Sequence, residues 1–436
     1  MSDKQDNNSN TKEKLLFIGF SPDNQNDFGR FTCELLPLLK EEYDITLFAI
    51  ENQTFTSGEV GYSMIEAQDS AGPFGFQKIV NVVNVLKPEH LIIFHHPQII
   101  AHYLNAIVYS GKCDLSSTQV LGFAGLDYSN PLMAEIKVLE EGLDGLLVTT
   151  NFAKKELKDG GFTKPIHLVQ GGKTSRDFMN LPQKEARKQL DLPLDTFIIY
   201  CGLENTTDNH LDILVESYIR FLAKYMDQLD EDDKPKIILL LGCGMIDRGW
   251  ALESLMETIA NEYKLENWDR YIKFAFRDRQ NNHPNFTNAY LNYIYNSVNL
   301  GVSSSSGQFW GFSNFDMASL GIPQIVPRVA AQGEIYDDKV HLIDPVLSYR
   351  APFVVDSSMG KRSVISIDNM TKALSQSYKE FIDNPIVWKQ KGRSLKQYME
   401  KYQWSESADR MIDAIKKIPV YRQKISEIDV GNKSRV

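Results

Sequence analysis

Residues 303–325 read SSSSGQFWGFSNFDMASLGIPQI, and this stretch constrains the fold more than any other part of the sequence. It opens with serine and glycine, small residues that let the backbone approach a ligand closely. We expect a helix from Ser313 to Leu320, because Gly321 ends it and Pro323 prevents it from resuming. The free N–H groups at the start of such a helix are suited to holding a phosphate.

Asp316 falls near the start of this expected helix, and two interpretations of it remain open. If its carboxylate faces a ligand, it accepts hydrogen bonds from a ribose diol. In the other interpretation the stretch is a tight turn that leads into a core helix, and Asp316 only complements the helix dipole.

On both sides of this stretch, short apolar runs alternate with amphipathic segments. The runs predict buried parallel strands at 15–20, 45–50, 90–96, 119–123, 145–149, 166–169, 197–201, 237–241, 271–276, 300–303 and 324–326. Helices are expected at 31–40, 76–86, 131–141, 151–158 and 211–225, with 21–30 as a loop and Asn151 as an N-cap. This alternation predicts an α/β protein with two Rossmann-like, doubly wound parallel-sheet domains.

The expected domain boundaries follow from where the alternation of strands and helices is interrupted and where it resumes. We expect a disordered tail at 1–13, a first domain at 14–178, a second domain at 179–395, terminal helices at 396–422 and a tail at 423–436.

The bulk properties exclude several classes of function. The chain has 436 residues and a net charge of −10, without a basic block, so neither nucleic acid nor a membrane surface is an expected partner. Its four cysteines form no CxxC pair, and no HxH or HExxH spacing occurs, so we expect no metal site. The start of the chain has no apolar signal segment, and no run of about 18 apolar residues exists, which favours a cytoplasmic protein.

The 303–325 stretch resembles the signature of retaining GT-B glycosyltransferases of group 4, which carry Glu-Gly-aromatic-Gly-Leu, a second Glu, and then a Gly-x-Pro. Gln308 falls at the first Glu, Phe309 at the first Gly, and Asp316 at the second Glu. Gly311 and Phe312 match the Gly-Leu pair. The segment GFSNFDMASLGIPQIVP is especially similar to sequences of glycosyltransferase-like proteins of large DNA viruses. This resemblance would place the protein in a host cytoplasm.

The resemblance extends over most of the chain. DFGRF, which contains Gly29, resembles the glycine loop before the first helix, and FHHP resembles a strand end that places His95 or His96 near the donor sugar. GLLVTTNFAKKELKDGGF is similar to the end of the first domain. KQYMEKYQWSESADRMIDAI is similar to the terminal helices that cross back to it.

Three positions depart from the family's pattern. Glu204 and Asn209 stand where the family has an Arg and a Lys that hold the diphosphate, and Gln308 replaces a Glu near the reacting carbon. Loss of two charge-assisted contacts removes roughly 1.5–3 kcal/mol each. We considered as substitute cations the basic residues that follow strands or turns near the expected cleft, namely Lys173, Arg176, Arg277, Arg279 and Arg328.

The resemblance implies a retaining glycosyltransferase that moves a sugar from a nucleoside diphosphate sugar to an acceptor glycan in a cleft between the domains, without a metal or other cofactor. It assigns Gln308, His95 and His96 to the sugar. It assigns the donor to Gly29, Gly202, Glu204, Asn209, Gly307, Phe309, Gly311, Phe312, Ser313 and Asp316. The departures favour an alternative, a non-catalytic GT-B pseudoenzyme that binds glycan or scaffolds a partner glycosyltransferase. A third alternative, a sugar-nucleotide epimerase, would need acid and base carboxylates that the sequence does not identify.

Overall fold

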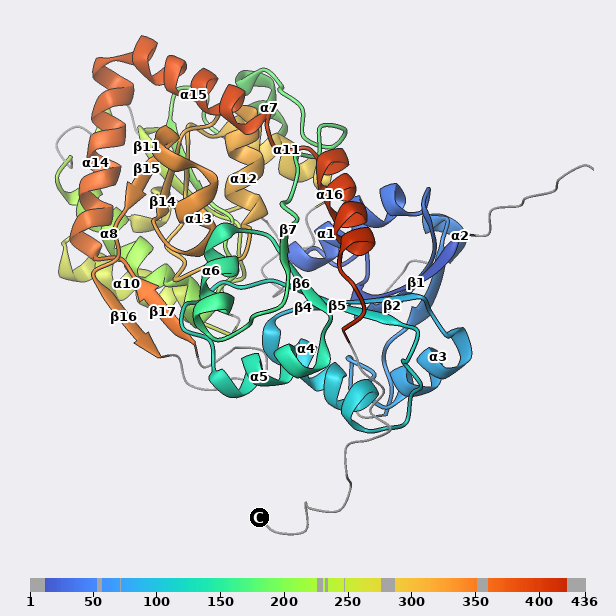
Figure 1. Cartoon of the computed structure of the whole chain (residues 1–436). Helices are drawn as coiled ribbons and strands as arrows, with labels where there is room; N and C mark the ends of the chain where they lie inside the picture. Colours follow the sequence, from blue (N-terminus) through green and yellow to red (C-terminus); the bar gives the residue numbers. More distant parts are fainter. Residues whose placement is uncertain are drawn as a thin grey trace, which may run out of the picture.

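The computed structural model describes residues 12–52, 57–70, 72–225, 230–231, 234–246, 248–275, 287–350 and 360–421. The described chain forms two lobes, each built on one parallel sheet with helices around it (Figure 1). The predicted fold class, two parallel-sheet α/β domains, is therefore confirmed. The predicted tails lie almost entirely outside the described residues.

The first lobe holds seven parallel strands in the order β3-β2-β1-β4-β5-β6-β7. They are β1 Glu13–Phe20, β2 Tyr43–Ile50, β3 Ser63–Glu66, β4 His90–His95, β5 Gln119–Ala124, β6 Gly145–Val148 and β7 Ile166–Leu168. The helices are α1 Asp27–Leu39, α2 Ser57–Val60, α3 Lys78–Leu86, α4 Pro97–Leu104 with a π-helical extension Asn105–Tyr109, α5 Met133–Gly142 and α6 Asn151–Asp159. The central strands are buried along their length, which is why they appear in the sequence as continuous apolar runs.

The second lobe holds six parallel strands in the order β12-β11-β8-β13-β14-β15. They are β8 Phe197–Cys201, β11 Ile237–Leu241, β12 Ile272–Phe274, β13 Leu300–Val302, β14 Gln324–Pro327 and β15 His341–Ile343. The helices are α7 Gln183–Gln189, α8 Leu211–Ala223, α10 Leu252–Glu262, α11 Asn288–Ser297, α12 Phe312–Leu320 and α13 Ala330–Ile335, with short 3₁₀ turns Thr207–Asn209, Trp268–Arg270 and Asp337–Lys339. Two hairpins complete the lobe, β9 Asp230–Glu231 with β10 Lys234–Pro235, and β16 Leu347–Arg350 with β17 Lys361–Val364.

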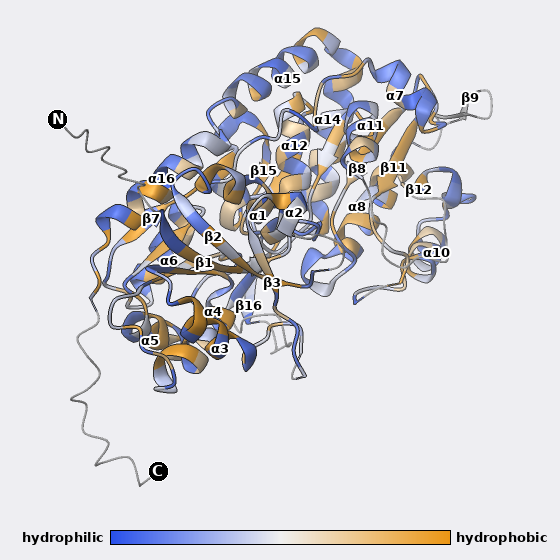
Figure 2. Cartoon of the chain, turned by 90° about the vertical axis from the view of Figure 1, so that its right-hand side faces the viewer, coloured by the Kyte–Doolittle hydropathy of each residue, from blue (hydrophilic) through white to orange (hydrophobic). Residues whose placement is uncertain are grey.

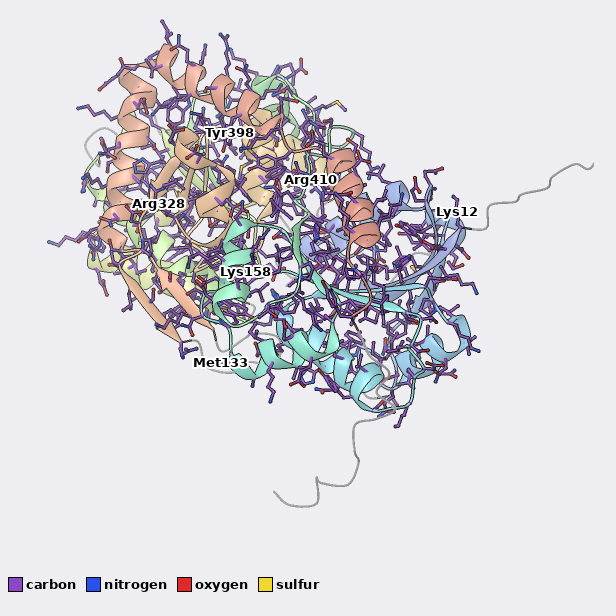
Figure 3. All side chains as sticks on the ribbon, in the orientation of Figure 1. Lys12, Met133, Lys158, Arg328, Tyr398 and Arg410 are labelled. Carbon is purple, nitrogen blue, oxygen red and sulfur yellow. The ribbon has the colours of Figure 1, made fainter. Side chains whose placement is uncertain are left out.

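The last helices return the chain to the first lobe. After α14 Ile367–Asp383 and α15 Pro385–Met399, α16 Trp404–Lys417 lies beside α1 (Figure 1). Trp404 and Met411 are buried in the core of the first lobe. Arg410, labelled on α16 in Figure 3, donates a hydrogen bond to the side chain of Gln170 after β7.

One apolar core runs through both lobes where they meet. Trp310, Phe312 and Phe315 of the second lobe belong to the same buried cluster as the strands of the first sheet. Figure 2 shows hydrophobic residues concentrated on the strands and hydrophilic residues on the outer helices. The lobes are therefore packed together by apolar burial as well as by the chain connections.

One expected helix start and one expected N-cap were wrong. Helix α1 begins at Asp27 rather than near residue 31, because the side chain of Asn26 caps the N–H of Gly29 at 2.8 Å. The residue that caps α6 is Thr150, not Asn151: Thr150 is extended, and its hydroxyl accepts the N–H of Ala153 at 3.1 Å. The earlier start of α1 places Asp27, Gly29 and Arg30 on a helix instead of in a loop.

Candidate functional site

Each sheet has one point where the chain reverses its direction across the sheet. In the first sheet β1 lies between β2 and β4, and in the second β8 lies between β11 and β13. Ligands of open parallel sheets bind beyond the carboxyl ends of the strands at such points. The segments that follow β1, β4, β8 and β13 carry most of the residues that the sequence singled out.

An anion site lies at the start of α12 and contains a carboxylate from the first lobe. The Asp27 carboxylate of α1 accepts the N–H of Gly311 at 2.7 Å and the N–H of Phe312 at 3.4 Å. Gly311 has a left-handed backbone (φ +85°), which few other residues adopt. Burial raises the pKa of Asp27 above its ordinary value, although both backbone hydrogen bonds act to lower it. The amides that we expected to hold a phosphate therefore bind the protein's own carboxylate.

Arg30, one turn further along α1, forms an ion pair with Asp316 of α12. Arg30 Nη1 lies 2.9 Å from Asp316 Oδ2, and Nη2 lies 3.1 Å from Oδ1. The guanidinium carbon also stands 4.8 Å from the ring centroid of Phe178 and 4.7 Å from that of Phe312. Burial raises the pKa of Asp316 to about 7, against the attraction of Arg30. The Asp316 side chain is 1% exposed, so in this structure it contacts Arg30 and does not face open solvent.

His95 ends β4 and His96 caps α4, and both lie near the seam, the interface between the two lobes. The Nδ1 of His95 accepts the N–H of His96 at 2.8 Å, which leaves the proton on Nε2, an atom without a hydrogen-bond partner among the described residues. Burial lowers the pKa of His95 well below its ordinary value, so the ring is neutral. The Nδ1 of His96 lies 2.8 Å from the carbonyl oxygen of Gly125 and donates to it, because a carbonyl oxygen can only accept. His96 is half-buried.

The loop after β13 is fixed by its own small side chains. The Ser305 hydroxyl donates to the carbonyl of Gly307 at 2.9 Å, and a side chain at Gly307 would place Cβ 1.8 Å from the carbonyl oxygen of Asp127 in the first lobe. Gln308 is half-buried and accepts a hydrogen bond from Gln332 at 3.2 Å. The loop therefore approaches the first lobe so closely that only glycine fits at position 307.

The loop after β8 carries the two positions at which the group 4 glycosyltransferases that the sequence resembles have cations. The Glu204 side chain is 63% exposed and pairs with Arg248 at 3.2 Å. Asn209 donates to the backbone carbonyl of Glu204 at 2.9 Å. A Cβ on Gly202 would lie 2.1 Å from the Ser313 hydroxyl oxygen, so this loop touches the start of α12. Glu204 acts on Asp27 by like-charge repulsion, which indicates that it lies within electrostatic range of the anion site.

Aromatic side chains fill the seam between the lobes. Phe28 of α1 and Phe309 lie with ring centroids 4.3 Å apart, and Phe28 also contacts His96 at 4.9 Å. A Cβ on Gly125 would be 3.0 Å from Phe28 and 3.1 Å from Phe309. Trp310 is fully buried and reaches Gly171 of the first lobe. The place where we expected a ligand between the lobes is occupied by side chains in this structure.

The sequence did not single out a second ion-pair group that joins the lobes. Arg362 of β17 lies 2.9 Å from Asp127 in the first lobe and 3.4 Å from Asp208 in the loop after β8. Burial acts to raise the pKa of Asp127, but the attraction and hydrogen bond of Arg362, together with His96, hold that pKa below its ordinary value. Asp27 and Arg30 were missed as well, although both stand in the quoted DFGRF motif, because that motif was interpreted as a loop.

The substitute cations that we considered bind carboxylates outside the anion site. Lys173 pairs with Glu400, Arg176 with Glu34 at 3.0 Å, and Arg328 with Asp344 at 2.7 Å. Arg328 is labelled on the second lobe in Figure 3. Arg277 and Arg279 lie outside the described residues.

The described residues contain no group of three or more His, Cys, Asp or Glu side chains placed to hold a metal ion. Nor does any helix in the described part of the chain have the length and apolar character that crossing a membrane requires.

A cavity of about 450 Å³ lies in the second lobe. Its lining includes Ile238 and Leu240 of β11, Phe274 of β12, and Tyr290 and Ile294 of α11. The seam residues do not line it, so it is separate from the anion site.

Solved structures with a similar fold are known. HepE of Anabaena, crystallised with UDP and glucose, superposes with a TM-score of 0.66 at 10% identity, covering 93% of this chain and 99% of that one. This chain has the GT-B fold. A sucrose-phosphate synthase from Thermosynechococcus elongatus gives a TM-score of 0.65 at 15% identity, covering 93% and 98%. A UDP-forming trehalose-phosphate synthase from Burkholderia xenovorans gives 0.62 at 10% identity, covering 94% and 99%.

No protein-family model matches the sequence, and no curated protein matches it. The fold likeness spans both lobes and nearly the whole length of each neighbour.

Proposed function

We propose that this protein is a retaining glycosyltransferase of the group 4 type that uses a nucleoside diphosphate sugar. One observation carries the proposal: the N–H groups of Gly311 and Phe312 at the start of α12 bind an anion at the point where the two sheets face each other. A helix N-terminus at the reversal point of a parallel sheet is suited to a phosphate. Among the neighbours of the fold, HepE was crystallised with UDP-glucose.

In this proposal a phosphate replaces the Asp27 carboxylate on the two amides. The acceptor enters from the first lobe beside His95 and His96, and closure of the lobes limits hydrolysis of the donor. Gln308 orients the sugar by hydrogen bonding, because an amide cannot supply a full negative charge. The leaving phosphate oxygen accepts the acceptor's proton, so the transfer needs neither a protein nucleophile nor a metal.

Calorimetry with UDP and GDP on the wild type and on Asp27→Asn tests this proposal. Removing the competing carboxylate is expected to tighten nucleotide binding by about tenfold, because two amides and a positive helix end become available to the phosphate. Asp44→Asn, an exposed carboxylate on β2, is the matched control and is expected to leave the affinity unchanged. A panel of nucleotide sugars, starting with UDP-glucose, then tests transfer to glycan acceptors.

A second candidate function is a non-catalytic GT-B module. The filled seam and the acid at position 204 favour it, because Asp27, Phe28 and Phe309 occupy the ligand's place. Absence of nucleotide binding in both the wild type and Asp27→Asn would support this candidate and overturn the first.

A further inference from the structure

Positions 204 and 209 carry cations in the group 4 glycosyltransferases that the sequence resembles, but in this chain they give the anion site no positive charge. Glu204 carries a negative charge and Asn209 none, and Glu204 acts on the carboxylate that occupies the site by repulsion. A diphosphate bound there needs a cation from another element, because backbone amides contribute only partial charges.

Arg30 stands next to the site on the helix that supplies the occupying carboxylate. It follows Asp27 by three residues on α1, so both side chains leave the helix on the same side. Its guanidinium lies against the ring of Phe312, the residue whose N–H the carboxylate accepts. Arg30 also attracts the Asp27 carboxylate, and so it acts on an anion at that position.

The ion pair with Asp316 leaves Arg30 able to bind a second acceptor. The two bonds to Asp316 use two of the five N–H groups of the guanidinium. The Phe178 and Phe312 rings hold the group in place, so a further bond costs little ordering of the side chain. The Arg30 side chain is 16% exposed, whereas that of Asp316 is 1% exposed.

Two other arginines near the seam are less suited to this role. Arg362 lies between the carboxylates of Asp127 and Asp208, so the net charge around it is negative. Arg248 is 66% exposed and pairs with Glu204, where solvent and salt screen its charge.

We infer that Arg30 is the residue that binds the ligand's phosphates, so that the positive charge comes from the first helix of the first lobe and not from the second lobe. This inference rests on the proposed function for the identity of the natural ligand, but its test does not. In the ligand-bound state the guanidinium bridges Asp316 and a phosphate oxygen, while the amides of Gly311 and Phe312 hold the same group.

The test uses inorganic pyrophosphate as the probe and the full chain in calorimetry. Pyrophosphate has neither ribose nor sugar, so it does not depend on a carboxylate at position 316. All variants carry Asp27→Asn, which removes the competitor. Asp316→Asn is compared with the pair Arg30→Gln/Asp316→Asn, because the pair leaves no buried charge without a partner. Circular dichroism melting verifies that each variant is folded.

Adding Arg30→Gln to the Asp316→Asn background is expected to weaken pyrophosphate binding by at least about tenfold, the size of one charge-assisted contact. Arg30→Lys in the same background, which keeps the charge but loses the planar fork, is expected to fall between the two. Arg176→Gln, which removes an exposed arginine that also pairs with α1, is the matched control and is expected to change nothing.

Equal affinities with and without Arg30, a loss caused by Arg248→Gln instead, or no pyrophosphate binding in any variant would each overturn the inference. The proposed function is judged separately by turnover of nucleotide sugars. Pyrophosphate binding that depends on Arg30 without any nucleotide binding would leave the inference standing and refute the glycosyltransferase.

Discussion

Glu334 of the second lobe accepts the backbone N–H of Phe152, in the first turn of α6 in the first lobe, at 2.9 Å. Its other carboxylate oxygen accepts the N–H of Asn151 at 3.0 Å. Asp27 of the first lobe makes the equivalent contact with α12 of the second lobe. Each lobe thus places a carboxylate on a helix N-terminus of the other, and the two contacts are reciprocal.

Replacing Glu334 by Gln is expected to loosen the seam on the α6 side. The amide keeps the size of the side chain but loses the charge, and a charge at a helix N-terminus contributes about 0.3–1 kcal/mol. Hydrogen exchange followed by mass spectrometry is expected to show faster exchange at the start of α6. The control is Glu406→Gln, an exposed carboxylate on α16. Unchanged exchange at α6 would show that the contact does not hold the lobes together.

Replacing Phe309 by Ala is expected to lower the free energy of unfolding by about 3–5 kcal/mol, the usual cost of removing a buried phenyl ring. The ring packs against Phe28 and beside His96, so the variant leaves a cavity within the seam. Urea denaturation measures the loss. Phe309→Leu retains most of the volume and is expected to cost less than half as much. A loss below about 1 kcal/mol for the alanine variant would mean that the seam is open in solution.

The stability of the fold should fall as the pH rises from about 4 to about 7 through the ionisation of Asp316. Burial raises the pKa of its carboxyl from 3.8 to about 7, so the folded chain binds the proton more tightly than the unfolded chain. The stabilisation that comes from the protonated Asp316 carboxyl is complete below pH 4 and is lost as the pH rises to about 7, with a slope of at most about 1.4 kcal/mol per pH unit. Above pH 7 the ionisation of Asp316 changes the stability no further.

Asp316→Asn is expected to lack this slope. Urea denaturation of the wild type and the variant between pH 4.5 and 8.5 isolates the contribution, because other titrating groups are common to both. A difference in stability that stays constant over this range would show that the ion pair with Arg30 keeps Asp316 ionised throughout.

Introducing two cations by Glu204→Arg with Asn209→Lys is expected to tighten UDP binding by about tenfold or more, if the proposed function holds. The change removes one repulsive charge and adds two attractive ones beside the anion site. Glu204→Gln alone separates the loss of repulsion from the gain of attraction and is expected to give the smaller effect. Unchanged affinity in the double variant would place the loop after β8 too far from the phosphates to affect them.

Most strands could be predicted from the sequence because each is a short apolar run between polar loops, whereas the edge strands β3 Ser63–Glu66 and β15 His341–Ile343 were not predicted. β8 Phe197–Cys201 and β11 Ile237–Leu241 were predicted with their bounds, since both are buried at every position. The helix from Phe312 to Leu320 was predicted within one residue at its start, because glycine and proline mark its end. The start of α1 was missed, because Asn26, Asp27 and Gly29 are residues that also favour loops.

The contacts across the seam could not be predicted, because they join residues far apart in the chain. Asp27 and Gly311 are 284 positions apart, and Arg30 and Asp316 are 286 apart. Asp316 was expected either to face a ribose or to complement a helix dipole, and neither interpretation included a buried arginine as its partner. Only the packing of α1 against α12 brings the two side chains together.

The glycine at position 307 offers a way to hold the two halves of the molecule apart. A methyl group there would stand 1.8 Å from the carbonyl oxygen of Asp127, a separation that no pair of non-bonded atoms tolerates. Alanine at position 307 would therefore push the loop after β13 away from Asp127 in the first lobe. Such a variant would let crystallographers and spectroscopists study the two halves at a greater separation than in this structure.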